Sequence, residues 1–405
     1  MFLALLLPTL VLASNLTLKL VTHDQKAVCI DGSPPGYYVR TNPSSDNFLI
    51  VLLGGGWCHT PAECYERSQT LYGSSTFWPP VLDHGLGLTS ADVTTNPTFS
   101  DWNVAVFIYC DGSSYSGNLE QPYSFNGTTL YSRGQRIFDA VIADLERSFG
   151  ADQANQVVLY GESAGGIGCL SHVDMLADRW SAVDVRGLCD SSFFIPVQAF
   201  SPANTTVVIP TMSNVFRYFN VTAGLDQSCV DALGDFRCLI AEFIFPFLST
   251  PTFMLQSQVD CDQFQNVGLQ CLPAPDNLPV PTPACNAQEL AYIVAFQKQM
   301  RQRAVAAGLF QTKGPIQHGL FFDSCIHHSI ALFGGYWNNP AYTIQGVTAA
   351  QAVKKWLGGA TVLFFDIPLW PAANPRCVAA FQSCLGDLKL PPWQCGPLPW
   401  QSHDC

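Results

Sequence analysis

The chain has 405 residues, of which 48% are hydrophobic, and its formal net charge is −12. A chain of this length and apolarity forms one large domain with insertions or two ordinary domains, and the composition excludes a disordered protein. The 19 Lys and Arg residues are outnumbered by 31 Asp and Glu residues. This balance argues against nucleic acid or an anionic membrane as the main partner.

The first segment of the chain is an apolar run over residues 1–14, MFLALLLPTLVLAS, with the small residue Ala13 near its end. The run is too short to span a bilayer and is typical of a secretory signal peptide. A buried N-terminal strand is the alternative. No later stretch has the length and apolarity of a transmembrane helix. We therefore expect a secreted, extracellular protein without a transmembrane segment.

Sixteen cysteines favour the same oxidising compartment. Zinc proteins with many cysteines carry paired C-x-x-C motifs, and none occurs here. The nearest spacing, from Cys58 to Cys64, is loose for zinc, so we expect no metal site and up to eight disulfides. The N-x-[ST] acceptor sequences for N-glycosylation begin at Asn15, Asn126, Asn204 and Asn220.

A glycine-rich loop follows the first predicted buried strand. Residues 47–53 form a continuous apolar run, which is typical of a strand covered on both faces in a parallel sheet. The loop GGGWC (54–58) lets backbone amides approach a ligand closely. Hydrolases with a serine at a strand-to-helix turn take one oxyanion donor from such a loop, so Gly56 and Trp57 are the candidates. A tight turn fixed by a disulfide at Cys58 is the alternative.

Strands and helices alternate through the first half of the chain. Residues 104–109 predict a second buried strand, and the polar loop 110–117 leaves its carboxyl end, where α/β proteins place their sites. An apolar stripe predicts a helix over 131–149, stopped at Gly150, and residues 156–160 predict a third strand. The alternation predicts an α/β fold with a mostly parallel sheet and helices on both faces.

The third strand runs directly into the pattern G-x-S-x-G at residues 161–165. Small residues must flank a serine at the apex of a strand-to-helix turn, because a side chain there would collide with the strand or the helix. Ser163 is therefore the candidate nucleophile, and the amide of Ala164 is a candidate oxyanion donor. A structural turn with an incidental serine is the alternative.

The middle of the chain, from about residue 191 to 247, is less regular. The strongly apolar segment 241–248 fits a cap or an acyl pocket, but a core segment of an inserted subdomain is the preferred interpretation. Residues 252–255 predict a further strand, and prolines predict a loop over 272–284.

The last part of the chain returns to regular elements. Asn286 is a candidate N-cap with Glu289 three positions later, and an apolar-periodic run predicts a helix that continues to residue 309. Strands are predicted to end at Phe321-Phe322 and to cover 361–365. The cysteine-rich tail is expected to be held to the body by disulfides. No linker forces a break, so we expect residues 15–405 to form a single domain.

A serine at such a turn needs a base, normally a histidine oriented by a carboxylate. In α/β-hydrolases the chain order is serine, acid, histidine, which excludes every histidine before the turn. His172 follows Ser163 too closely to return as the base. The remaining candidates are His318, His327, His328 and His403. The pair His327-His328 is favoured because it follows a strand-like segment, and spacing gives His328 only a slight preference.

The acid should follow a strand that lies between the serine and the histidine in the chain. Asp260 comes shortly after the predicted strand 252–255, which makes it the preferred carboxylate. Its competitors are Asp262, Asp323 and Asp366.

Six segments of the chain together point to a known family. They are LLGGGWC (52–58), NPTFSDWNVAVFIYCDGSSYSG (96–117), LYSRGQRIFDAVIADL (130–145), GESAGG (161–166), PTFMLQSQVDCDQ (251–263) and DSCIHH (323–328). In these segments, and in their order along the chain, the sequence resembles the pectin acetylesterase/Notum family of serine esterases. The resemblance implies an α/β-hydrolase fold with a Ser-Asp-His triad and no metal or organic cofactor.

The resemblance assigns each member of the triad to a position of this chain. The family nucleophile lies in a G-x-S-A-G-G turn, which implies Ser163. The family aspartate follows a strand of the form F-I-L-N-S-x-Y-D, which implies Asp260. The family histidine ends an S-C-x-x-H segment, which implies His328 and not His327.

The resemblance also implies that the GGGW loop and the residue after the nucleophile supply the oxyanion donors, hence Gly56, Trp57 and Ala164. Two positions depart from the family pattern. Val259 stands where the family usually has tyrosine, and Glu162 stands where plant members typically have cysteine. Neither departure removes a catalytic group.

The plant branch of the family removes acetyl groups from pectin, and the animal branch removes palmitoleate from a signalling protein. The segments RGQR (133–136) and CDG (110–112) resemble the plant branch, which implies an acetylesterase acting on cell-wall polysaccharide. A polyanionic substrate needs a basic groove, for which the candidates are Arg67, Arg133 and Arg136. A Notum-like lipid esterase and a non-catalytic secreted binding protein on the same scaffold are the alternatives. The sequence makes no prediction of oligomeric state.

Overall fold

The computed structural model describes residues 15–82, 85–201, 205–269, 271, 285–311, 314–332, 335–367 and 369. Four predictions fall outside these residues: the signal peptide over 1–14, the loop 272–284, the tail 377–405 and the sequon at Asn204.

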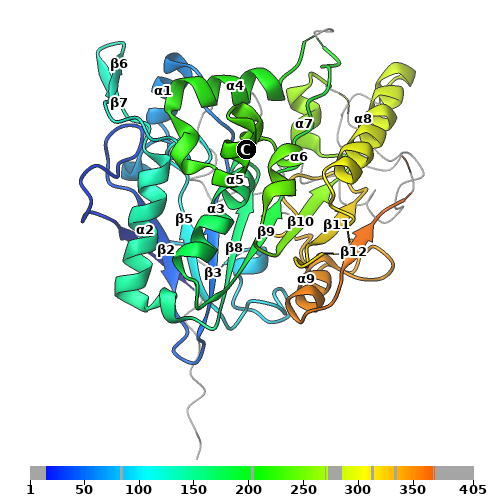
Figure 1. Cartoon of the computed structure of the whole chain (residues 1–405), viewed down its shortest axis with the longest axis horizontal. Coiled ribbons are helices and arrows are strands. Elements are labelled where there is room, and N and C mark those ends of the chain that lie inside the picture. The colour runs from blue at the N-terminus through cyan, green and yellow to red at the C-terminus, as the bar shows by residue number, and fades with distance from the viewer. Residues whose placement is uncertain are drawn as a thin grey trace, which may run out of the picture.

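Among the described residues, a ten-stranded sheet forms the centre of the molecule (Figure 1). Its strands are β1 (Leu16–Leu20), β2 (Gly36–Arg40), β3 (Asn47–Leu52), β4 (Val81–Leu82), β5 (Asn103–Phe107), β8 (Gln156–Glu162), β9 (Asp184–Asp190), β10 (Thr252–Ser257), β11 (Gly319–Asp323) and β12 (Leu363–Phe365). Their order is β12-β11-β10-β9-β8-β3-β5-β2-β1-β4. Every pair from β12 to β5 is parallel, whereas β2, β1 and β4 join antiparallel at the other edge. The predicted mostly parallel sheet is confirmed.

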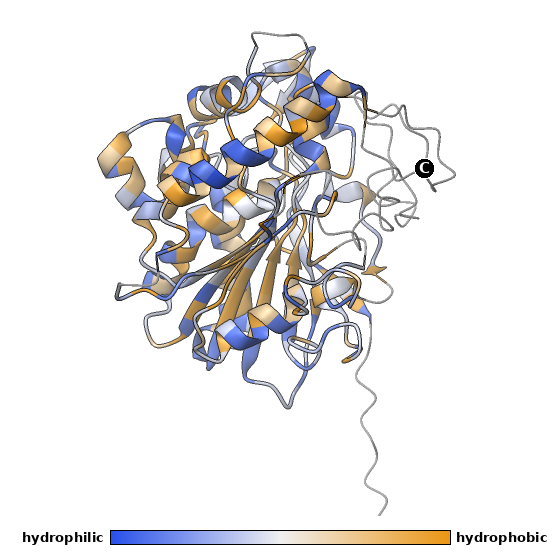
Figure 2. Cartoon of the chain, turned by 90° about the vertical axis from the view of Figure 1, so that its right-hand side faces the viewer, coloured by the Kyte–Doolittle hydropathy of each residue, from blue (hydrophilic) through white to orange (hydrophobic). Residues whose placement is uncertain are grey.

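The inner strands β3 and β5 are mostly apolar because other elements cover both of their faces. All of β5 is buried, and so is β3 after its first residue. Figure 2 shows the central strands as a hydrophobic layer inside the molecule. The predicted strands over 47–53 and 104–109 are confirmed, with ends that differ from the prediction by one or two residues.

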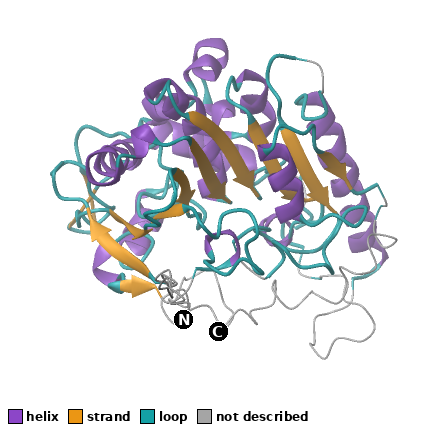
Figure 3. Cartoon of the chain, turned by 90° about the horizontal axis from the view of Figure 1, so that it is seen from below, coloured by secondary structure: helices purple, strands orange, loops and turns teal. Residues whose placement is uncertain are grey.

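In the described part of the chain, nine α-helices surround the sheet (Figure 3). They are α1 (Pro61–Ser68), α2 (Gly134–Phe149), α3 (Ala164–Arg179), α4 (Val208–Phe219), α5 (Gln227–Leu233), α6 (Ala241–Ile244), α7 (Cys261–Asn266), α8 (Ala287–Ala306) and α9 (Ala349–Leu357). Helix α2 begins at Gly134 rather than at 131 and ends at Phe149, and the following residue, Gly150, has a left-handed φ of 63°. Helix α8 follows Asn286, which forms the predicted capping box with Glu289.

The side of the sheet on which the chain adds strands changes between β3 and β8. Strand β5 pairs with one side of β3, and the chain then crosses to place β8 on the other side. Open α/β sheets bind ligands at the carboxyl ends of the strands that flank such a change. Leu52 at the end of β3 lies opposite Gly161 of β8, so the loops that follow these two strands leave the sheet side by side.

The irregular middle of the chain packs into the body. Ala241, Ile244, Phe245 and Leu248 are buried, and α6 contacts both α3 and α8. The segment 241–248 is therefore part of the core, as the preferred interpretation predicted. Figure 1 shows α4 at the end of the molecule toward which the parallel strands point.

The described cysteines are all oxidised. Disulfides join Cys29–Cys110, Cys58–Cys64, Cys169–Cys189, Cys229–Cys238 and Cys271–Cys285. Cys261 and Cys325 are disulfide-bonded as well. Within the described residues, we find no helix that is both long enough and apolar enough to cross a membrane.

Three of the predicted glycosylation sites can be placed. Asn15 and Asn220 are exposed, and Asn126 is exposed at the tip of a hairpin formed by β6 (Tyr123–Phe125) and β7 (Thr128–Leu130). Their glycosylation stays a prediction.

Candidate active site

The serine turn joins β8 to α3 within a single residue. Ser163 has φ 57° and ψ −123°, a conformation that non-glycine residues rarely adopt, and its amide donates to the Asp190 carbonyl at 2.9 Å. Added Cβ atoms at Gly161 and Gly165 would collide with the carbonyl oxygens of Gly165 and Leu52. The sequence requires glycine on both sides because strand, turn and helix touch here through their backbones.

The glycine-rich loop after β3 lies directly against this turn. An added Cβ at Gly54 would lie 2.8 Å from Ser163 Cβ, and the Gly54 amide donates to Glu162 Oε1 at 2.7 Å. Among the described residues, none accepts a hydrogen bond from the amides of Gly56, Trp57 or Ala164. Ala164 directly follows Ser163, and the glycine-rich loop touches the serine turn at Gly54, so these three N–H groups are candidate donors to a developing oxyanion.

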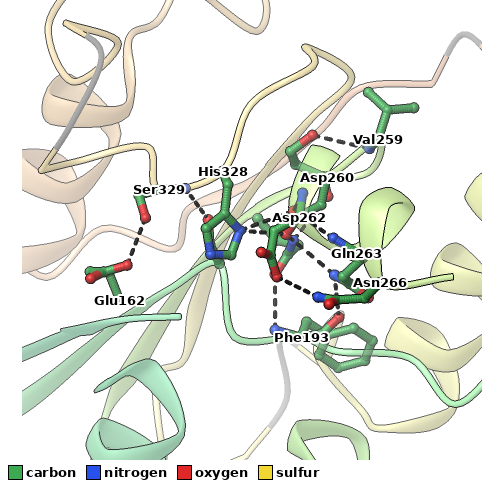
Figure 4. A network of polar contacts seen from close by, with 12 residues as sticks. Glu162, Phe193, Val259, Asp260, Asp262, Gln263, Asn266, His328 and Ser329 are labelled. Atoms are coloured by element: carbon green, nitrogen blue, oxygen red, sulfur yellow. Dashed lines mark hydrogen bonds and ion pairs between the residues drawn. The ribbon is translucent and has the colours of Figure 1, made fainter. Parts of the chain in front are cut away.

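The histidine and the acid come from the ends of two adjacent parallel strands. Asp260 follows β10 and caps helix α7, and His328 lies in the loop after β11, which pairs with β10. His328 Nδ1 lies 2.9 Å from Asp260 Oδ1 and 3.1 Å from Oδ2 (Figure 4). The structure therefore brings together the two residues that the resemblance selected.

Asp260 is fully buried and is held by several donors. It accepts hydrogen bonds from the side chains of Gln256 at 3.0 Å and Gln263 at 3.3 Å, and from the Asp262 amide at 3.0 Å. Burial alone would raise the pKa of Asp260, but His328 and these side-chain amides outweigh it and lower the pKa below its usual value. The carboxylate stays ionised and fixes the orientation of the imidazole.

His328 is surrounded by acidic groups. Burial alone would lower its pKa, but Asp260, Asp262 and Glu162 outweigh burial and raise the pKa of His328 to about 10. With Nδ1 turned to Asp260, the other ring nitrogen, Nε2, is the atom left to exchange a proton with a substrate or a hydroxyl. The arrangement is that of a carboxylate-oriented general base.

The competing candidates are engaged elsewhere. His327 is buried, lies 2.9 Å from Asp323 through Nε2 and stacks on Tyr336 at 4.7 Å between ring centroids. His318 accepts a hydrogen bond from the Thr252 amide at 3.2 Å. His403 lies outside the described residues.

The competing carboxylates also have other partners. Asp262 accepts from Asn266 at 2.9 Å, and the Asp366 carboxylate accepts from the Ser324 hydroxyl. The Asp323 carboxylate contacts His327 Nε2. None of the three makes a hydrogen bond to His328 among the contacts of the described residues.

Two buried carboxylates that sequence reasoning did not select hold the loop after His328. Asp190 Oδ2 accepts from the amides of Ile330 at 2.8 Å and Ala331 at 2.7 Å. Glu162 Oε2 accepts from the Ser329 hydroxyl at 2.7 Å (Figure 4). The only local signal was the departure from the family pattern at Glu162, because these contacts join positions that are far apart in the chain.

The prediction of a basic groove formed by Arg67, Arg133 and Arg136 is wrong. Arg67 is 1% exposed and Arg133 is 4% exposed, so neither offers its guanidinium to a polymer. The Arg136 side chain is paired with Asp24 at 2.8 Å. A pattern of arginines in the sequence does not distinguish exposed from buried cations.

Two groups of metal-ligand types occur among the described residues. They are Asp323, Cys325 and His327, and Cys271, Cys285 and Glu289. The cysteine of the first group and both cysteines of the second are disulfide-bonded and cannot act as thiolate ligands. Neither group offers a complete ligand set for a transition metal.

Comparison with known proteins finds similarity to one family model and to named esterases. A family model described as Pectinacetylesterase matches residues 11–378. The chain is 32% identical to pectin acetylesterase 5 of Arabidopsis thaliana, over 90% of this chain and 84% of that protein. It is 31% identical to the palmitoleoyl-protein carboxylesterase NOTUM of Schmidtea mediterranea, over 77% of this chain and 58% of that protein.

Proposed function

The chain belongs to the pectinacetylesterase family of carboxylic ester hydrolases, and on that premise we propose that it is a serine esterase that works through an acyl-enzyme. In this proposal Ser163 is the nucleophile, His328 is the general base and Asp260 orients the base. The observation that carries the proposal is the 2.9 Å contact between His328 Nδ1 and Asp260, which leaves Nε2 to accept the serine proton.

The reaction proceeds in two halves. Ser163 attacks the ester carbonyl carbon while His328 takes its proton, and the new oxyanion lies between the amides of Gly56, Trp57 and Ala164. Losing one such donor typically costs about 2.7–4 kcal/mol of transition-state stabilisation. His328 then gives the proton to the leaving alcohol, and water attacks the acyl-enzyme with His328 again as the base.

The proposed substrate class is an acetyl ester on a cell-wall polysaccharide. The name of the Arabidopsis relative and the plant-like segments 110–112 and 133–136 support it. The net charge of −12 and the burial of Arg67 and Arg133 disfavour extended contact with a polyanion. The proposed recognition is therefore of the acetyl group and its sugar, rather than of the charges along the polymer.

A lipid ester on a protein is the second candidate substrate, and the name of the planarian relative supports it. Secretion belongs to the proposal as well. The apolar run over residues 1–14 and the oxidised cysteines of the described part support it.

The test is hydrolysis of p-nitrophenyl esters from acetate to palmitate by the secreted protein, beside Ser163→Ala and His328→Ala. We expect activity that is highest on acetate and is lost in both variants, while secretion and the thermal midpoint are retained. A preference for long chains would replace the acetyl substrate with a lipid one. Full activity in Ser163→Ala would overturn the serine mechanism, and a folded protein inactive on every ester would favour the binding-protein alternative.

A further inference from the structure

The loop that carries the proposed oxyanion donors is anchored through its carbonyl groups. Arg67 Nη1 donates to the Gly55 carbonyl at 2.8 Å, and the Tyr109 hydroxyl donates to the Gly56 carbonyl at 2.9 Å. These two carbonyls belong to the same peptide groups as the N–H donors of Gly56 and Trp57. In a planar trans peptide the C=O and the N–H point in opposite directions, so fixing one fixes the other.

The two anchors lie on the same side of the loop. The Arg67 guanidinium lies over the Tyr109 ring, 4.9 Å from its centroid, and 5.2 Å from the centroid of Tyr72. Both carbonyls are therefore drawn toward one cluster, and both amides are turned to the opposite side. Gly55 and Gly56 have φ of 138° and 66°, which residues with a side chain adopt only with strain. Glycine at both positions therefore allows the two successive peptide groups to take these orientations.

Arg67 is a buried cation beneath the glycine-rich loop. Arginine is rarely fully buried, yet Arg67 is 1% exposed and makes no direct ion pair with a carboxylate of the described residues, although its charge interacts with that of the buried Asp111. Its hydrogen bonds go to the carbonyls of Gly55 and Tyr72, and helix α1 together with the Cys58–Cys64 disulfide holds it under the loop. A guanidinium on a carbonyl also polarises that peptide group and strengthens its N–H as a donor.

The polar loop 110–117 has a part in the same arrangement. The Ser114 amide donates to the Tyr109 oxygen at 2.9 Å, so the hydroxyl proton is directed to the Gly56 carbonyl. Ser114 Oγ accepts a hydrogen bond from the Trp57 indole at 2.8 Å. This bond fixes the side chain of Trp57, whose backbone amide is one of the proposed oxyanion donors. Burial raises the pKa of Tyr109, so the hydroxyl keeps its proton as a donor.

We infer that Arg67 and Tyr109 are positioning residues that aim the amides of Gly56 and Trp57 at the oxyanion. This inference rests on the proposed serine esterase function. Neither residue touches the substrate. Arg67 acts through the Gly55 carbonyl on the Gly56 N–H, and Tyr109 acts through the Gly56 carbonyl on the Trp57 N–H.

The test compares Tyr109→Phe with Tyr38→Phe. Both tyrosines are buried and both hydroxyls donate to a backbone carbonyl, but Tyr38 contacts Pro79, away from the site. With p-nitrophenyl acetate we expect Tyr109→Phe to lower kcat about tenfold to about a hundredfold with KM unchanged, because a misaimed donor is a partial loss of the oxyanion site. Tyr38→Phe also loses a buried hydrogen bond to a backbone carbonyl, but it should keep kcat. Equal kcat in the two variants would overturn the inference.

A second readout isolates the oxyanion. A trifluoromethyl ketone that forms a hemiketal with Ser163 places an oxyanion against the same amides, so its affinity should fall in Tyr109→Phe by the factor by which kcat/KM falls. Arg67→Lys keeps the charge but cannot reach both carbonyls, and it should show the same parallel loss. If kcat/KM falls and the ketone affinity does not, Tyr109 does not aim the donors.

Ser163→Ala distinguishes failure of the serine mechanism from failure of the positioning role. If that variant is inactive and Tyr109→Phe behaves as Tyr38→Phe does, the serine mechanism stands and the positioning role is wrong. If Ser163→Ala retains activity, both are wrong.

Discussion

The carboxylate of Glu162 accepts a hydrogen bond from the hydroxyl of Ser329 at 2.7 Å, and each of these residues is the chain neighbour of a proposed catalytic residue. Glu162 precedes Ser163, and Ser329 follows His328. The second oxygen of Glu162 accepts from the Gly54 amide at 2.7 Å. One buried carboxylate thus joins the serine turn, the histidine loop and the glycine-rich loop, and Figure 4 shows its contact with Ser329.

Glu162→Gln should lower kcat and shift the activity profile to lower pH. The amide cannot accept from both Gly54 and Ser329, and a buried donor left unpaired costs about 1–3 kcal/mol. Removing the charge also removes one of the groups that raise the pKa of His328. Glu242→Gln, which alters a glutamate paired with Arg303 at 2.6 Å, is the control. If Glu162→Gln and Glu242→Gln share the wild-type pH profile, Glu162 does not act on the base.

Asp260→Asn should be far more damaging than Asp262→Asn. Asp260 contacts His328 Nδ1 directly, whereas the hydrogen bond of Asp262 goes to Asn266. An asparagine in place of a triad aspartate typically lowers kcat by about 10⁴ because it orients the wrong tautomer. Single-turnover rates on p-nitrophenyl acetate measure the two variants. The reverse ranking would assign the acid to Asp262.

Activity should rise with pH beyond the range of an ordinary histidine. The base must be neutral to take the Ser163 proton, and its acidic neighbours raise the pKa of His328 to about 10. The rate constant kcat/KM should therefore climb through neutral pH and level off only in the alkaline range, with Ser163→Ala as the blank for spontaneous hydrolysis. Asp262→Asn should lower the midpoint because Asp262 is one of the charges that raise it. A plateau reached near the ordinary histidine pKa of about 6.5 would contradict this.

Gly54→Ala should damage both stability and turnover. The added methyl group would collide with the Glu162 carbonyl and lie 2.8 Å from Ser163 Cβ, so either the loop or the serine turn must move. Such overpacking costs about 1–3 kcal/mol. Gly314→Ala is the control, because a Cβ there meets open space at an exposed position. Thermal midpoints and kcat measured side by side check the expectation, and equal values in both variants would refute it.

The inner parallel strands could be predicted from the sequence because burial on both faces leaves an uninterrupted apolar run, as in β3 and β5. Strand β9 was missed because it carries Asp184, Arg186 and Asp190, so its residues form no such run. The antiparallel strands β1 and β2 were missed as well. The pairing of β2 with β5 and of β1 with β2 depends on a register that no local sequence pattern predicts.

The site was predictable where a motif fixes the backbone and unpredictable where distant side chains meet. Ser163 follows from the small residues that its turn requires. Spacing could not choose between His327 and His328, since only the fold shows that His327 turns to Asp323. Arg67 was assigned to a surface groove because the sequence does not reveal the two tyrosine rings that enclose it.

The contacts of Glu162 also have a consequence for the folding of the chain. Glu162 reaches Gly54, 108 positions earlier, and Ser329, 167 positions later. Contacts between such distant positions form late, because the entropy of closing a long loop opposes them until the intervening chain is ordered. A partly folded chain is therefore an inactive one. In a refolding experiment, the return of esterase activity marks the completion of folding and should lag behind the return of helical secondary structure.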